Sequence, residues 1–127
     1  MEKPHKKLDV WNFALDLVVE IYTLTRLLPH EERYNLIGQM RQAAVSIPAN
    51  IAEGAARNTK KEFANFLHIA QGSLSELDTH IEVAKRLEYV KPAECSSIDL
   101  LMDRIDKMLT GLIKRQKISE TGKTGRR

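Results

Sequence analysis

A long stripe of apolar residues between residues 60 and 88 constrains the fold of this chain more than any other feature. Its members step by three or four residues without a break: Phe63, Phe66, Ala70, Leu74, Leu77, Ile81 and Ala84. That spacing places them on one face of an α-helix, and no segment alternates polar and apolar residues as a half-buried strand does. Thr59 and Glu62 add a capping-box pattern at the start. The sequence therefore predicts a long helix over 60–88 in an all-α protein.

The same spacing predicts three more helices. The first runs from about 9 to 28, with Asp9 as N-cap, and ends at Pro29. The second covers about 35–56, and its inner face is Leu36, Met40, Ala43, Ala44, Ile47 and Ile51. The fourth covers 92–116, beginning at Pro92, with the stripe Cys95, Ile98, Met102, Ile105, Leu109 and Leu112. Four helices with short connections predict an up-down-up-down antiparallel bundle.

The first helix has more apolar surface than one bundle face needs. One stripe is formed by Trp11, Leu15, Val18 and Tyr22, widened by Ala14, Ile21 and Leu28. A further apolar side is formed by Val10, Phe13, Leu17 and Leu24. A helix that is apolar around most of its circumference is usually buried on more than one side. We therefore expect this second side to be an oligomer interface; the alternative is one wide core face.

The net charge of +3 is unevenly distributed. Residues 1–7 hold three basic residues and one acidic residue, and residues 114–127 hold six and one, which leaves 11 basic and 15 acidic residues in 8–113. We divide the chain into a basic arm (1–8), the bundle (9–116) and a disordered basic tail (117–127). The single cysteine suits a reducing cytoplasm, and neither a secretory signal nor a membrane span is predicted.

Residues 41–58, RQAAVSIPANIAEGAARN, place a proline and several polar residues inside the second helix. Pro48 costs an ordinary helix roughly 3 kcal/mol and predicts a kink, with helix continuing beyond it. Gly72 in the third helix is expected to mark a close helix crossing. Two polar rows could form a hydrogen-bonded seam or remain solvated faces: Ser46, Asn50 and Glu53 on the second helix, and Ser73, Glu76 and His80 on the third.

Several segments together resemble one known family. They are KLDVWNFALDLV (7–18), QMRQAAVSIPANIAEG (39–54), IAQGSLSELDTHIEVAKRLEYV (69–90) and LTGLIKRQK (109–117). These segments are similar to the four-helix-bundle proteins called the 23S rRNA-intervening-sequence protein family. Gln42 departs from the family pattern, in which an arginine commonly follows Arg41, so a paired-arginine site is not carried over.

The resemblance implies a left-handed antiparallel bundle that assembles as a ring, commonly a homopentamer. A related group of similar fold serves as accessory proteins of diversity-generating retroelements. Those proteins form pentamers with basic surfaces and work with a reverse transcriptase and nucleic acid. The family name records where some of the genes lie and implies no biochemical activity.

The sequence offers little for catalysis or cofactor binding. A di-iron bundle site needs Glu-x-x-His motifs, and none occurs. Cys95 lies on an apolar helix side, which favours a packed thiol over a nucleophile. Gly54 and Gly72 make no phosphate-binding glycine pattern. We therefore predict a protein that is not an enzyme and has no metal or cofactor.

Two binding functions remain open. Basic residues near one end of the predicted bundle could bind the phosphates of RNA or DNA, and a ring would repeat them: Arg57, Lys60, Lys61, Lys114, Arg115, Lys117 and the tail residues Lys123, Arg126 and Arg127. The alternative is a protein-binding scaffold or accessory factor, for example for a reverse transcriptase. A plain solvated surface would also explain the lysines.

Overall fold

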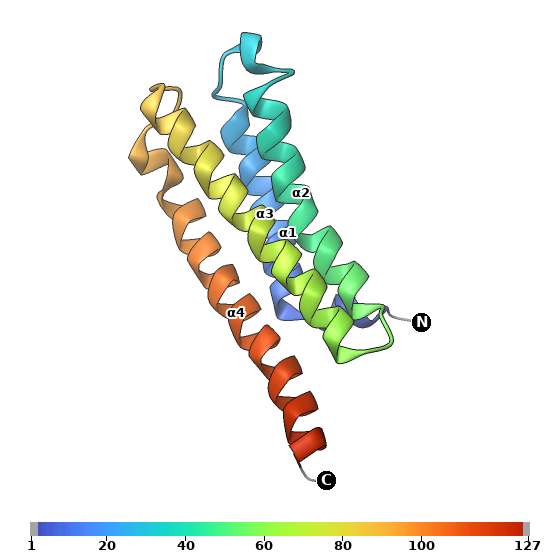
Figure 1. Ribbon diagram of the computed structural model, residues 1–127. Helices are drawn as coiled ribbons and strands as arrows, with labels where there is room; N and C mark the ends of the chain where they lie inside the picture. Colours follow the sequence, from blue (N-terminus) through green and yellow to red (C-terminus); the bar gives the residue numbers. More distant parts are fainter. Residues whose placement is uncertain (1–2, 126–127) are drawn as a thin grey trace.

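The computed structural model describes residues 3–125, and it describes side chains for residues 3–118. Two short 3-10 helices, η1 (Pro4–Lys7) and η2 (His30–Glu32), accompany four α-helices. The α-helices are α1 (Asp9–Thr25), α2 (Leu36–Ala55), α3 (Lys60–Arg86) and α4 (Pro92–Gly125). They pack as an antiparallel bundle in which each helix contacts its neighbours in the chain and α1 also contacts α4 (Figure 1). The predicted all-α four-helix bundle is confirmed.

The predicted inner faces of α2, α3 and α4 form the core. The α2 residues Met40, Ala44, Ile47 and Ile51 are fully buried. Every member of the α4 stripe from Cys95 to Leu112 is also buried. On α3, the stripe from Ala70 to Ala84 is buried, while Phe63 and Phe66 near its start are half-buried. Burial of this apolar area is the main force that holds the four helices together.

The structure divides the apolar residues of the first helix differently from the prediction, although Ala14, Ile21 and Leu28 lie in the core as expected. The core takes Val10, Ala14, Leu17, Ile21, Leu24 and Leu28, which are all buried within one chain. Val10, Leu17 and Leu24 are therefore not surplus surface, and the interface assigned to them is wrong. Phe13 is half-buried under the guanidinium of Arg104, whose Cζ lies 4.2 Å from the ring centroid.

The surplus apolar surface of α1 lies instead on the face that was expected to be core. Leu15 is 38% exposed, Val19 66% and Tyr22 36%. Trp11 and Val18 are half-buried at the edge of the same face. The physical reason is that α2 and α4 flank α1 on the Val10–Leu17–Leu24 side, so that side receives the core contacts.

Several helix ends differ from the sequence-based expectation; α1, for example, ends at Thr25 and not near residue 28. Leu8, not Asp9, is the N-cap of α1, and no side chain caps this helix; Asp9 is the first helical residue. Helix α4 continues to Gly125, beyond the predicted end near 116, because no residue between 116 and Gly122 breaks a helix. The capping box at Thr59 is confirmed, since the Glu62 amide donates to its Oγ1 over 3.1 Å.

A close helix crossing occurs at Gly54, and none occurs at Gly72, where it was expected. A Cβ on Gly54 would lie 2.7 Å from the Cβ of Phe66 and 3.0 Å from Cδ1 of Phe63. A Cβ on Gly72 would meet nothing within 4 Å, and Gly72 is exposed. The end of α2 therefore rests directly on the start of α3, and only glycine fits there.

Helix α2 remains helical through Pro48, as predicted. The Oγ atoms of Ser46 and Ser73 lie 2.7 Å apart and join α2 to α3. The Asn50 amide donates to the Ser46 carbonyl over 2.8 Å and to the Ser46 hydroxyl over 3.1 Å. Ser46, Asn50 and Ser73 therefore form the polar seam. Glu53 stays exposed and pairs with Arg57 just beyond the end of α2, and Glu76 stays exposed beside His80 on α3.

The two glycines supply a paired stability test. Gly54→Ala should lower the free energy of unfolding by about 1–3 kcal/mol, because the new methyl group overpacks the α2–α3 contact. Gly72→Ala should raise it by up to about 1 kcal/mol, because alanine favours a helix and open space surrounds this site. Urea unfolding of both variants measures the difference; equal effects would contradict the assigned crossing.

Candidate nucleic-acid interface

Three separate parts of the chain bring basic residues to one end of the bundle. The first part is η1 with the residue before it, which together hold Lys3, Lys6 and Lys7. The second is the α2–α3 connection with the first turn of α3, and the third is the last described turns of α4. Figure 1 shows the N-terminus, this connection and the end of α4 at the same end of the molecule. We call this region the basic end.

The pairing of α3 with α4 fixes the level of the basic residues on these two helices. The Gln71 side chain donates to Oγ1 of Thr110 over 2.8 Å. Because antiparallel helices rise equally per residue, Lys60 and Lys61 lie at the level of residues 120–121 of α4, about one turn beyond Lys117. Lys117 follows Thr110 by two helical turns, so it lies on the α3 side of α4. The structure therefore brings these three predicted residues to the same end of the α3–α4 pair, within about one helical turn of one another along the axis.

The pairing of α1 with α4 places a second basic pair at the same end. Arg104 covers Phe13, and Arg115, about three turns further along α4, reaches the level of η1. Lys7 and Arg115 line a groove of about 500 Å³ between the start of α1 and α4. The predicted Arg115 therefore joins a lysine that the sequence reasoning had left out of the candidate set.

The other predicted basic residues differ in their surroundings. Arg57 is held locally, because Nη2 lies 3.1 Å from Oε1 of Glu53 and Cζ lies 4.8 Å from the centroid of the Phe66 ring. Lys114 is exposed on α4. Lys123, Arg126 and Arg127 lie outside the residues whose side chains the structure describes. Arg57 thus contributes less free charge than Lys114, Arg115 and Lys117.

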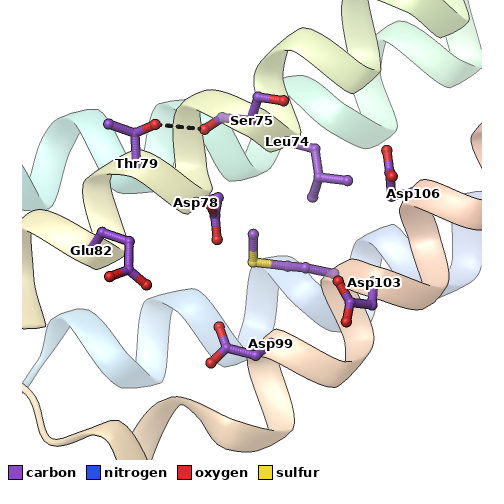
Figure 2. Close-up of a pocket in the computed structure, with 9 residues that line it drawn as sticks. Leu74, Ser75, Asp78, Thr79, Glu82, Asp99, Asp103 and Asp106 are labelled. Atoms are coloured by element: carbon purple, nitrogen blue, oxygen red, sulfur yellow. Dashed lines mark hydrogen bonds between the residues drawn. The ribbon is translucent and has the colours of Figure 1, made fainter.

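An acidic groove lies further along the α3–α4 pair, away from the basic end. Figure 2 shows the carboxylates that line it, Asp78, Glu82, Asp99, Asp103 and Asp106. The groove encloses about 480 Å³ above Leu74 and Met102. Lys85 closes it at one end, with Nζ 3.2 Å from Glu82 and 3.3 Å from Asp99. The like charges of these carboxylates make this groove unfavourable for a phosphate group.

The described side chains show no arrangement suited to metal binding or nucleophilic catalysis. No group of three or more His, Cys, Asp or Glu residues within residues 3–118 could hold a metal ion. Cys95 is fully buried, and burial raises the pKa of its thiol, which keeps it protonated and unreactive. Within the described residues, no helix is both long enough and apolar enough to cross a membrane.

Comparison with known proteins identifies the family. The sequence profile of the 23S rRNA-intervening sequence proteins matches residues 6–111, most of the bundle. The chain belongs to that family. The fold is similar to a crystal structure of a protein of unknown function from the S23 ribosomal protein family of Bacteroides thetaiotaomicron. That protein is 29% identical, the match covers 83% of this chain and 95% of the other, and the TM-score is 0.76. No curated protein matches this chain.

Some contacts in this 23S rRNA-intervening sequence protein were missed by sequence reasoning. Arg41 on α2 donates from Nε to Oγ1 of the buried Thr25 over 2.9 Å, and its Cζ lies 4.5 Å from the centroid of the Tyr22 ring. The acidic groove was also missed. Asp99, Asp103 and Asp106 have helical spacing, and so do Asp78 and Glu82, which was a visible signal. Their convergence depends on the α3–α4 pairing, which spacing alone does not give.

The acidic groove predicts a pH-dependent stability effect. Burial raises the pKa of Asp78, and repulsion from Glu82, Asp99 and Asp103 raises it further. The folded state therefore binds this proton more tightly than the unfolded state, and stability falls as pH rises through the raised pKa. Asp78→Asn should raise the melting temperature at pH 7, and the gain should disappear below about pH 4.

Thermal unfolding of Asp78→Asn at several pH values measures this effect. Asp16→Asn, which removes a carboxylate of α1 outside the groove, controls for the change in net charge. The groove electrostatics would be refuted by a gain of equal size at pH 4 and pH 7.

Proposed function

We propose that this 23S rRNA-intervening sequence protein is a non-enzymatic cytoplasmic bundle that binds the phosphate backbone of RNA or DNA at its basic end. The observation that carries the proposal is the separation of charge along the molecule. Basic residues from η1, α3 and α4 gather at one end, and five carboxylates occupy the α3–α4 groove further along. Phosphate contacts supply most of the affinity of sequence-independent binding.

The charge separation also favours a defined orientation of the ligand. A field that is positive at one end and negative along one side attracts a polyanion toward the basic end and orients it before contact. Lys117 with Lys60 and Lys61 would contact phosphates on the α3 side of α4. Lys7 and Arg115 would contact them on the α1 side. One strand passing over the end of α4 could reach both sets.

The proposal predicts a strong and local salt dependence. Charge reversal of Lys114, Arg115 and Lys117 to Glu should lower the slope of log affinity against log salt by about 2 to 3, because each lost phosphate contact removes about 0.7 to 0.9. Fluorescence anisotropy with a labelled RNA between low and moderate salt measures the slope.

A matched control carries the same change in net charge at the other end of the bundle. Arg33, Arg86 and Lys91 are exposed near η2, the end of α3 and the start of α4. Their reversal to Glu should leave the slope close to that of the wild type. Equal losses in both triple variants, or binding that salt does not weaken, would rule out the proposed interface.

We also propose that the protein forms a closed ring of identical subunits, with five subunits as the family resemblance implies. The exposed apolar residues of α1 are Leu15, Val19 and Tyr22, and those of α3 are Ile69, Val83 and Leu87. Helices α1 and α3 lie diagonally in the bundle, since among the described residues they do not contact each other. Two different apolar faces on opposite sides favour head-to-tail contacts, which close into rings. A ring would multiply the basic ends and raise the avidity for a long strand.

The ring predicts a mass that is a multiple of the 14.5 kDa chain. Val19→Glu should reduce it to one chain, because a carboxylate would be buried in the contact between subunits. Leu100→Glu should not, because Leu100 is exposed on α4, outside both faces. Multi-angle light scattering measures the masses of the wild type and of the two variants. A wild-type mass of 14.5 kDa would contradict the ring.

The apolar face of α1 also supports a second candidate function. A protein-binding scaffold or accessory factor, for example for a reverse transcriptase, would use Leu15, Val19 and Tyr22 to contact its partner, because exposed apolar patches often mark protein interaction sites. In that case Val19→Glu would abolish partner binding and leave the mass of the protein alone unchanged.

A further inference from the structure

The groove between the start of α1 and α4 has an apolar floor and a charged rim. Its floor is formed by Leu8, Val10, Met108 and Leu112. Lys7 and Arg115 supply positive charge at the rim, and Asp9 supplies one carboxylate. The volume of about 500 Å³ falls within the range of about 300–1,000 Å³ that is typical of small-molecule sites. The groove is thus large enough to hold one planar ring with polar groups at its edge.

Gly111 lines this groove, and the packing of the chain gives no reason for a glycine there. It lies in the interior of α4, where glycine costs about 1 kcal/mol relative to alanine. A Cβ on Gly111 would meet no atom within 4 Å, in contrast to Gly54, where packing excludes a side chain. The glycine keeps the groove open beside Met108 and Leu112, where a side chain would fill it.

We infer that this groove receives one unpaired base of a single-stranded nucleic acid, whose flanking phosphates are bound by Lys7 and Arg115. This inference rests on the proposed function and names the form of nucleic acid that the basic end selects. The base would pack on the apolar floor, where the thioether of Met108 makes favourable contacts with an aromatic ring. A base within a duplex is stacked and paired, so it cannot enter the groove.

Asp9 gives the groove a preference among ligands. An ionised carboxylate only accepts hydrogen bonds, so it can accept from the exocyclic amino group of cytosine, adenine or guanine. Uracil has no such group. The ionised carboxylate side chains of an acidic peptide have no hydrogen-bond donor to offer Asp9. The combination of Lys7, Asp9 and Arg115 therefore favours an amino-bearing base with phosphates over an acidic protein segment.

The inference is tested by filling the groove without changing its charge. Gly111→Leu should weaken binding of a labelled cytidine heptamer by about tenfold, the effect of losing one stacked base, and leave binding of a duplex unchanged. Gly72→Leu is the matched control, because Gly72 is also an exposed glycine inside a helix with open space around it. It should bind the heptamer as the wild type does. Circular dichroism checks that both variants remain helical.

A second measurement tests the role of Asp9. The wild type should bind the cytidine heptamer more tightly than a uridine heptamer, and Asp9→Ala should remove most of that difference. Acidic peptides with the same net charge as the heptamer should not displace it from the protein.

The outcomes separate this inference from the proposed function. Loss of heptamer binding in Gly111→Leu alone supports the groove. Four results would overturn the groove and leave the proposed function standing, provided that salt-dependent binding to the basic end persists. They are wild-type affinity in Gly111→Leu, equal losses in both leucine variants, an equal loss of duplex binding, and effective competition by acidic peptides. No binding of either nucleic acid by the wild type would overturn both proposals.

Discussion

The contact between α2 and α3 is the constraint on which the rest of the structure depends. Gly54 lets the end of α2 lie directly against Phe66 at the start of α3, and Ser46 bonds to Ser73 two turns away. These contacts fix the axial position of the two helices that share the most extensive contact in the bundle. Since α4 pairs with α3 through Gln71, they also determine which residues of α4 reach the basic end.

Burial of the apolar core stabilises the bundle, so the surface can hold clusters of like charge that are themselves unfavourable for folding. Like charges gathered in the α3–α4 groove work against folding, as the raised pKa of Asp78 indicates. A bundle with a continuous core from Val10 to Ile113 can tolerate that cost. The carboxylates occupy one part of the α3–α4 pair, and our proposal assigns phosphate binding to the basic end instead.

The sequence predicted the helices and most of the core because the apolar spacing of α2, α3 and α4 occupies one face only. It failed for α1, where apolar residues surround the helix and only the positions of α2 and α4 decide that Leu17 is core and Leu15 is surface. It also placed the close helix crossing at Gly72 and not at Gly54, because spacing does not show at which glycine an added Cβ would meet a neighbouring helix. Among the candidate site residues, Lys60, Lys61 and Lys117 were chosen for their places near helix ends, and their role stays a prediction. The Lys7–Arg115 groove depends on contacts between helices distant in sequence, which local patterns do not contain.

The central claim is that one end of this bundle binds nucleic acid through segments that the fold brings together. A titration of the isotopically labelled protein with single-stranded RNA, followed by amide NMR shifts, tests it most directly. Shifts should concentrate in residues 3–10, 60–61 and 108–118, with the amides of Asp78–Glu82 and Asp99–Asp103 unchanged. The account would be contradicted by shifts centred on the acidic groove, or by none at all at low salt.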